Sequence, residues 1–79
     1  MTKEVTYKIV RPLEVLGEND RGYTKEINLV SWNFAPAKLD LREWHPEHER
    51  CGKGITLSET EGRKLMEALI RFFAENDKG

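Results

Sequence analysis

The sequence contains few of the features that stabilise small proteins covalently. It has a single cysteine, Cys51, in 79 residues, so neither an internal disulfide nor a zinc site built from several thiolates can form. A chain of this length buries only about 60–65% of its unfolded surface, which is near the lower limit for independent stability. Self-association is the remaining common source of stability, and we expect it here. A single unpaired thiol is also more typical of a reducing cytosol than of a secreted protein.

Long apolar runs and an excess of charge of one sign are missing too. No run approaches the length of a membrane span and no signal peptide precedes Val5, so we expect a soluble, cytoplasmic protein without membrane contact. Thirteen Lys and Arg against fourteen Asp and Glu give a net charge of −1, which disfavours non-specific binding to duplex nucleic acid. A local basic groove stays compatible with this balance, because charges act mainly within about 8 Å at cellular salt.

Four segments have the alternating pattern of half-buried strands. Pro12 interrupts the first segment and cannot donate a ladder hydrogen bond, so this strand is expected at a sheet edge or with a bulge. Turn-forming residues occupy 17–22, and every connection between strands is too short for a parallel crossover, which predicts an antiparallel sheet. The expected strands cover residues 5–16, 23–33, 39–44 and 52–57.

One helix is expected after the last strand, from Glu59 to about Glu75. Ser58 and Glu61 have the spacing of a capping box, and Gly62 in the first turn suggests a close backbone approach. The whole chain is thus predicted to be one α+β domain, a four-stranded antiparallel sheet followed by a C-terminal helix. A broad apolar stripe on the helix could cover the sheet and still contact a partner, so we expect it to form a dimer interface. The stripe consists of Leu65, Met66, Leu69, Ile70, Phe72 and Phe73.

Alternation divides the central strands into two faces. One face carries only apolar side chains and is expected to be the core side. The other face combines two tryptophans with cations and carboxylates. The expected core side holds Ile27, Leu29, Leu39 and Leu41, and the opposite face holds Glu26, Trp32, Lys38, Asp40, Arg42 and Trp44.

Residues for catalysis or metal binding are sparse. His45, His48 and Cys51 lie in one loop, but three ligands crowded into one loop do not match structural zinc spacings, and we interpret the histidines as solvated surface residues. Residues 52–54, Gly-Lys-Gly, are too short for a phosphate-binding loop and precede a strand rather than a helix. We therefore expect no enzymatic activity, no metal and no cofactor.

The sequence has more residues suited to binding single-stranded nucleic acid than to catalysis or metal binding. Single strands are held by aromatic rings that stack on bases and by cations that follow the phosphates. Trp32 and Trp44 could be the rings, with Lys38 and Arg42 nearby, and Lys53 between two glycines could approach a phosphate. Tryptophans in small sheets more often pack under a helix or at a dimer seam, however, and residue patterning alone favours that structural interpretation.

A family resemblance changes this balance. The strand Leu-Asp-Leu-Arg-Glu-Trp at 39–44, a Pro-Glu-containing loop, and Gly-Lys-Gly-Ile-Thr-Leu-Ser at 52–58 before a helix resemble the transcriptional coactivator family of positive cofactor 4. The small bacterial YdbC-like members are the most similar. Their strand with the pattern Thr-Lys-Glu-(Ile/Leu)-Asn-Leu-Val-Ser-Trp-Asn corresponds to residues 24–33 here. The resemblance covers about residues 24–69 in ordered, collinear motifs.

The resemblance implies a curved sheet, a homodimer, and binding of single-stranded or melted DNA across the sheets with little sequence preference. By position it implies that Arg42 and Lys53 contact phosphates and that Trp32 and Trp44 are aromatics of the binding surface. The full set of expected contacts is Lys25, Trp32, Asn33, Lys38, Arg42, Trp44 and Lys53. RNA stays open as an alternative ligand, because no residue predicts a contact to the 2′-hydroxyl.

The expected role is in transcription or DNA maintenance, in the cytoplasm and associated with the nucleoid. The alternative hypothesis is a protein-interaction module, in which the same sheet and helix dock a partner of the transcription machinery such as RNA polymerase. Salt dependence separates the two hypotheses, because release of counterions makes nucleic-acid binding steeply sensitive to salt.

Overall fold

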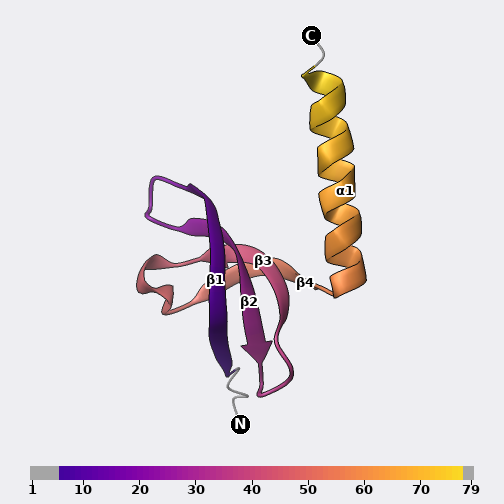
Figure 1. Cartoon of the computed structure of the whole chain (residues 1–79). Helices are drawn as coiled ribbons and strands as arrows, with labels where there is room; N and C mark the ends of the chain where they lie inside the picture. The colour runs from indigo at the N-terminus through magenta and orange to yellow at the C-terminus, as the bar shows by residue number, and fades with distance from the viewer. Residues whose placement is uncertain (1–5, 78–79) are drawn as a thin grey trace.

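The computed structural model describes residues 6–77 and contains one sheet and one long helix. The four strands are hydrogen-bonded in sequence order, each antiparallel to the next (Figure 1). This confirms the predicted antiparallel sheet followed by a C-terminal helix, with boundaries within about two residues of those expected; Val5, the expected start of the first strand, lies outside the described residues. The elements are β1 Tyr7–Glu18, β2 Thr24–Trp32, β3 Lys38–Trp44, the 3₁₀ turn η1 Pro46–His48, β4 Cys51–Leu57 and α1 Glu59–Asn76.

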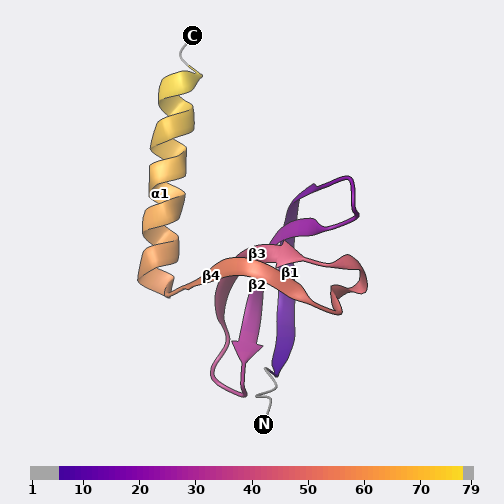
Figure 2. The same cartoon turned by 180° about the vertical axis from the view of Figure 1, so that it is seen from behind.

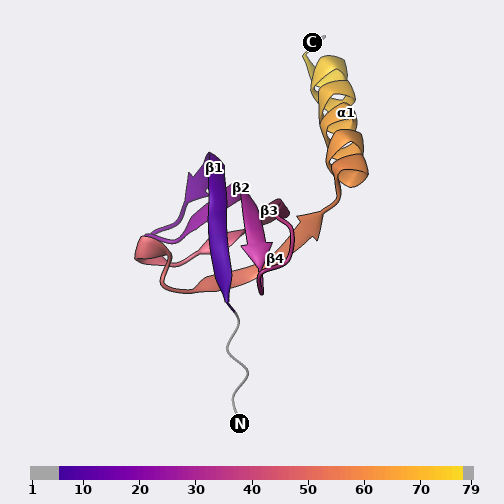
Figure 3. The same ribbon diagram turned by 60° about the horizontal axis from the view of Figure 1, so that its bottom comes forward.

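The edge strand β1 bends sharply because it is bulged. Its register against β2 shifts between Ile9 and Arg11, again between Pro12 and Glu14, and a third time after Val15. Each bulge adds a residue to one strand, bends it and increases its twist, and the sheet is visibly curved when seen from below (Figure 3). The prediction that Pro12 marks a bulged edge strand is confirmed.

The start of α1 is fixed by the predicted capping box. Glu61 donates its backbone N–H to the Ser58 hydroxyl at 3.1 Å, and the Glu61 carboxylate accepts the Ser58 N–H at 2.8 Å. The hydrogen bond from the Ser58 backbone, followed by an interaction with the Ser58 side chain, holds the pKa of Glu61 below its ordinary value. The close approach expected at Gly62 is also present, since a Cβ there would lie 2.6 Å from Leu39 Cδ1.

Beyond its first turns, α1 projects away from the sheet (Figures 1 and 2). The radius of gyration is 14.8 Å, whereas a compact domain of this length would have about 12 Å. The apolar stripe of α1 is therefore 37–60% exposed. Near its base, the helix and the apolar face of the sheet enclose a hollow of about 300 Å³, to which the sheet contributes Ile27, Leu39 and Leu57.

The side of the sheet that is buried differs from the prediction. The face with Ile27, Leu29, Leu39 and Leu41, here called the outer face, is only half-buried, because α1 does not lie along it. The opposite, inner face contains the fully buried Val30 and Trp44. Its burial results from the curl of the sheet, which brings Tyr7 of β1 and His48 of η1 against Trp44, with ring centroids 5.1 and 5.3 Å away.

Three polar residues also lie on this buried inner face. Polar side chains can be buried when they are hydrogen-bonded, and each of these three is. Glu26, Asn28 and Asp40 are each at most 4% exposed, and all three side chains take part in hydrogen bonds. Within residues 6–77, no helix has both the length and the apolar character needed to cross a membrane.

Candidate nucleic-acid interface

The inner face opens into a groove at its Trp32 end. The groove has a volume of about 530 Å³ and lies between the β2–β3 turn and β4. Antiparallel pairing places the contributing positions side by side, with Val30 opposite Lys38 and Asp40 opposite Thr56. We call it the Trp32 groove; its lining residues are Trp32, Ala35, Pro36, Lys38, Arg42, Cys51 and Thr56.

The β2–β3 turn that borders the groove is tightly organised. Asn33 and Phe34 adopt left-handed backbone angles, with φ of 50° and 66°, and Ala35 donates its N–H to the carbonyl of Trp32 at 2.9 Å. The Ser31 hydroxyl donates to the Ala35 carbonyl at 2.6 Å. These bonds fix Ala35 beside the ring of Trp32. Asn33 itself is exposed at the end of β2, where its Oδ1 accepts the backbone N–H of Thr6 at 3.0 Å.

Trp32 is held in the groove from two directions. Its indole Nε1–H donates to Asp40 Oδ2 at 3.1 Å, and its ring lies 5.6 Å from that of Tyr7 at an interplanar angle of 48°. The guanidinium carbon of Arg42 is 4.6 Å from the ring centroid of Trp32, which is within the range of a cation–π interaction. The ring is half-buried and borders the groove.

Arg42 is anchored as firmly as Trp32. Its Nε–H donates to Asp40 Oδ1 at 2.7 Å and an Nη1–H donates to the carbonyl of Gly52 at 3.2 Å. The hydrogen bond to Asp40 is the main cause that raises the pKa of Arg42 above its ordinary value, so the side chain stays charged. These two contacts to described residues use two of the five guanidinium N–H donors. The Arg42 side chain is 15% exposed where it borders the groove.

Lys38 completes the cationic side of the groove. It is exposed at the start of β3, on the same face as Arg42. Trp32, Lys38 and Arg42 are therefore the predicted contacts that the structure brings together. An aromatic ring with two cations beside it can stack on a planar base and contact the neighbouring phosphates.

The structure contradicts the expected stacking role of Trp44. This side chain is 0% exposed, and its ring is packed among Tyr7, His48 and Trp32. A base could reach it only if the inner face opened. Trp44 is thus a core residue, packed by side chains of β1, β2 and η1 rather than under the long helix, and its indole N–H has no hydrogen-bond partner among the described residues.

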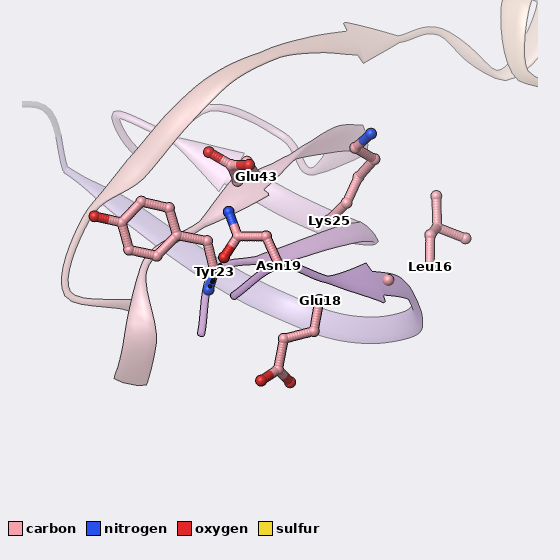
Figure 4. Close-up of a pocket in the computed structure, with 7 residues that line it drawn as sticks. Leu16, Glu18, Asn19, Tyr23, Lys25 and Glu43 are labelled. Carbon is pink, nitrogen blue, oxygen red and sulfur yellow. Dashed lines mark hydrogen bonds between the residues drawn. The ribbon is translucent and has the colours of Figure 1, made fainter. Parts of the chain in front are cut away.

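Lys25 and Lys53 lie away from the Trp32 groove. Lys25 alternates with the buried Glu26 and pairs with Glu43, so it belongs to the outer face. Figure 4 shows Lys25 and Glu43 at a hollow of about 270 Å³ beside the β1–β2 hairpin. A second hollow, of about 400 Å³, is bordered by Lys25, Lys53, Glu43, Leu41 and Arg42. The parity of the positions carried this signal, because Lys25 is two residues from Ile27 and Lys53 two residues from Ile55.

The loop histidines are partly exposed, in line with their interpretation as surface residues, but each also makes a defined contact. The His45 ring stacks on Tyr23 with centroids 4.2 Å apart, and His48 Nε2 lies 2.9 Å from Glu26 Oε2. Burial tends to raise the pKa of Glu26, but hydrogen bonds from Asn28, Thr24 and His48 outweigh it and hold this pKa below 4.5. Glu26 is thus an ionised structural carboxylate. Residues 6–77 contain no group of three or more His, Cys, Asp or Glu side chains arranged for a metal ion.

Several residues of the groove were not predicted from the sequence. Asp40 was expected only as one of the polar side chains opposite the core side, whereas it is buried and holds both Trp32 and Arg42. Cys51 and Thr56 of β4 and Ala35 and Pro36 of the turn also line the groove. Thr56 was detectable only through the register of β3 against β4, which the sequence alone does not specify.

Comparison with known proteins gives a relative without an assigned function. No family model matches the chain. A protein from Treponema pallidum (strain Nichols), described as an uncharacterized protein, is 36% identical over 63 residues, which cover 80% of this chain and 74% of the Treponema protein. The chain belongs to the same family as this Treponema protein.

Proposed function

We propose that this protein binds single-stranded nucleic acid, DNA in the first place, through the Trp32 groove, and that it does so as a homodimer. The observation that carries the proposal is that the ring of Trp32 and the guanidinium of Arg42 are both held in place at the edge of an open groove. The similarity of residues 24–69 to the positive cofactor 4 family supports the same conclusion. In this proposal the protein is not an enzyme and acts in transcription or DNA maintenance at the nucleoid.

The groove suits one nucleotide unit and its neighbours. Its volume of about 530 Å³ falls within the range of about 300–1,000 Å³ that is usual for ligand sites. A base stacked on an aromatic side chain such as Trp32 contributes about 1–3 kcal/mol. Arg42, whose guanidinium lies over the ring of Trp32 and borders the groove, can form charge-assisted hydrogen bonds with a phosphate, and Lys38 adds a second positive charge.

Low sequence preference follows from the lining of the groove. Ala35 and Pro36 offer apolar surface, and Trp32 offers a ring whose indole N–H is already bonded to Asp40. Thr56 is the one uncharged hydroxyl side chain in the lining. Stacking and phosphate contacts do not distinguish bases, whereas sequence readout requires hydrogen bonds to base edges. Lys25 and Lys53 face the outer side and are not part of this proposed path.

The homodimer is proposed from the exposed stripe of α1. In a single chain, six large apolar side chains of the helix are 37–60% exposed and the hollow at its base is lined by apolar residues. Exposed apolar area of this extent usually marks an interface. We assign it to a second copy of this chain, because a two-fold dimer would cover two identical helices at once and would add the core that so short a chain lacks.

The alternative function is docking of a protein partner, for example the transcription machinery, without direct contact to nucleic acid. The same exposed stripe of α1 favours it. The two proposals differ in the groove, because a protein contact through the helix makes no use of Trp32 or Arg42.

The proposal is tested by the affinity for a fluorescently labelled oligothymidine of about twenty nucleotides, measured by anisotropy over a series of salt concentrations. We expect log affinity to fall with log salt by about 0.7 per contacted phosphate on a single strand. Arg42→Ala should weaken binding and reduce this slope by about 0.7 for each protomer whose groove contacts the strand. Lys64→Ala, which removes one positive charge from the exposed part of α1, serves as the matched control and should leave both values unchanged.

Two results would reject the proposed function. One is the absence of binding at low salt, which would favour the protein-docking alternative. The other is equal binding by the wild-type protein and Arg42→Ala, which would place the nucleic acid elsewhere on the molecule.

A further inference from the structure

We propose that Asp40 is a positioning residue of the Trp32 groove, which fixes the indole of Trp32 and the guanidinium of Arg42 in the orientation that receives a nucleotide. This inference rests on the proposed function. It concerns a residue that would not touch the ligand. Asp40 is 0% exposed and pairs with Thr56 of β4 and Asn28 of β2, so it sits in the middle of the sheet.

The two carboxylate oxygens of Asp40 have separate tasks. Oδ2 accepts the indole N–H of Trp32 at 3.1 Å, and Oδ1 accepts the Nε–H of Arg42 at 2.7 Å. Both donors come from side chains that line the groove, one from β2 and one from β3. The ring and the cation are thereby also fixed relative to each other, with 4.6 Å between the Arg42 Cζ atom and the ring centroid.

A carboxylate at this place is unfavourable for phosphate binding on electrostatic grounds alone, because it offsets the charge of Arg42. Its benefit is conformational. Arginine side chains lose much rotamer freedom when they are immobilised, and a residue that immobilises them before binding removes that cost from the binding step. Asp40 therefore weakens the electrostatic attraction of the groove for phosphate but keeps Trp32 and Arg42 in place before a ligand binds.

Asparagine tests this division of labour, since it has the size of aspartate but only one acceptor oxygen. Its amide NH₂ would face either the Trp32 N–H or the Arg42 Nε–H, so Asp40→Asn must break one of the two bonds. The positioning role then makes oligothymidine binding about tenfold weaker, as expected when a hydrogen bond to a charged group is lost. The salt slope should stay the same, because the same phosphates are contacted.

A charge-balancing role would give the opposite result. Removal of a negative charge beside Arg42 would then make binding tighter, and the salt dependence would become steeper. The experiment compares wild-type protein, Asp40→Asn and Glu26→Gln with the labelled oligothymidine at several salt concentrations. Glu26→Gln is the matched control, because Glu26 is a buried carboxylate of the same face whose hydrogen bonds go to Thr24, Asn28 and His48.

A second measurement follows the free proteins by NMR. In the wild type, the Trp32 Nε1–H and the Arg42 Nε–H should exchange slowly with solvent; at least one of them should exchange faster in Asp40→Asn, and both should stay slow in Glu26→Gln. Unchanged exchange, or wild-type affinity of Asp40→Asn, would overturn the positioning role while oligothymidine binding by the wild type still upholds the proposed function. If the wild type does not bind, both proposals fail.

Arg42→Lys provides an independent test if Asp40→Asn does not fold. Lysine keeps the positive charge but lacks the Nε–H that Asp40 holds and the planar fork of arginine. We expect about tenfold weaker binding with an unchanged salt slope. Wild-type affinity in Arg42→Lys would show that charge alone suffices, and the positioning role of Asp40 would then be wrong.

Discussion

Replacement of Leu69 by aspartate should separate the proposed dimer into monomers. Leu69 lies in the apolar stripe of α1 and is 48% exposed in the single chain. Complete burial of a leucine contributes about 1.5–3 kcal/mol, so covering the exposed half contributes about 1 kcal/mol in each protomer. Across a two-fold interface the substitution removes about 2 kcal/mol, because each change occurs twice.

The introduced charge adds a larger penalty. An unpaired polar group costs about 1–3 kcal/mol when it is buried, and an ionised carboxylate costs more. Two aspartates therefore add at least about 4 kcal/mol, which brings the total to about 6 kcal/mol. A tenfold change in dissociation constant corresponds to about 1.4 kcal/mol, so the dimer should weaken by about four orders of magnitude.

Sedimentation equilibrium over a range of protein concentrations measures this effect. The chain has a mass of 9.2 kDa, and the wild type should sediment with twice this mass. Leu69→Asp should sediment as a monomer. If the fold depends on the interface, circular dichroism should show that this variant is unfolded. Arg71→Asp is the matched control, since the helical period places Arg71 opposite the stripe, and it should remain dimeric. A folded Leu69→Asp dimer would refute the interface, and a monomeric wild type would refute the homodimer itself.

Three further predictions concern the sheet. Trp44→Ala should lower the free energy of unfolding by about 3–5 kcal/mol in urea denaturation. The milder Trp44→Phe should still bind oligothymidine. Loss of binding by a folded Trp44→Phe would show that the Trp44 ring does take part in the interface. Because the folded pKa of Glu26 lies below 4.5, its carboxylate stabilises the protein above about pH 4.5, and this stability is lost as the pH falls through the folded pKa. The urea midpoint of Glu26→Gln should therefore change less with pH across this window than that of the wild type. Parallel pH profiles of the two proteins would contradict this expectation. Gly54→Ala should prevent normal pairing of β3 with β4, because its Cβ would overlap that of Arg42, and a variant with wild-type thermal stability would show that the two strands are less close.

The local features of the fold were predictable from sequence because their signals are local. The Ser58–Glu61 capping box fixed the start of α1, and alternation located the strands to within about two residues. Pro12 marked the bulged edge strand for a steric reason that needs no tertiary information. The antiparallel order followed from connections too short for crossovers.

The choice of the buried face was not predictable by the same means. Hydrophobic patterning assigned the core to the side of Ile27 and Leu41, but the deepest burial is on the side of Trp44 and Val30. The cause is the curl of the sheet, produced by three bulges in β1, together with the contact between His48 and Glu26, 22 residues apart. No pattern within one strand carries information on either.

The candidate site was predicted in part. Trp32, Lys38 and Arg42 share a face by parity, and the structure places them around one groove. Lys25 and Lys53 were expected to join them, although their parity with Ile27 and Ile55 places both on the outer face. The role of Asp40 needed the three-dimensional structure, because a buried acceptor between two donors has the same sequence pattern as an exposed charge pair.

The most direct test of the proposed function is a titration of intrinsic tryptophan fluorescence with oligothymidine at low and moderate salt. The chain has two tryptophans, of which Trp32 borders the groove and Trp44 is buried. We expect saturable quenching in the wild type that weakens with salt, and little quenching in Trp32→Phe, where Trp44 alone emits. Binding without quenching, or equal quenching in Trp32→Phe, would contradict stacking of bases on Trp32.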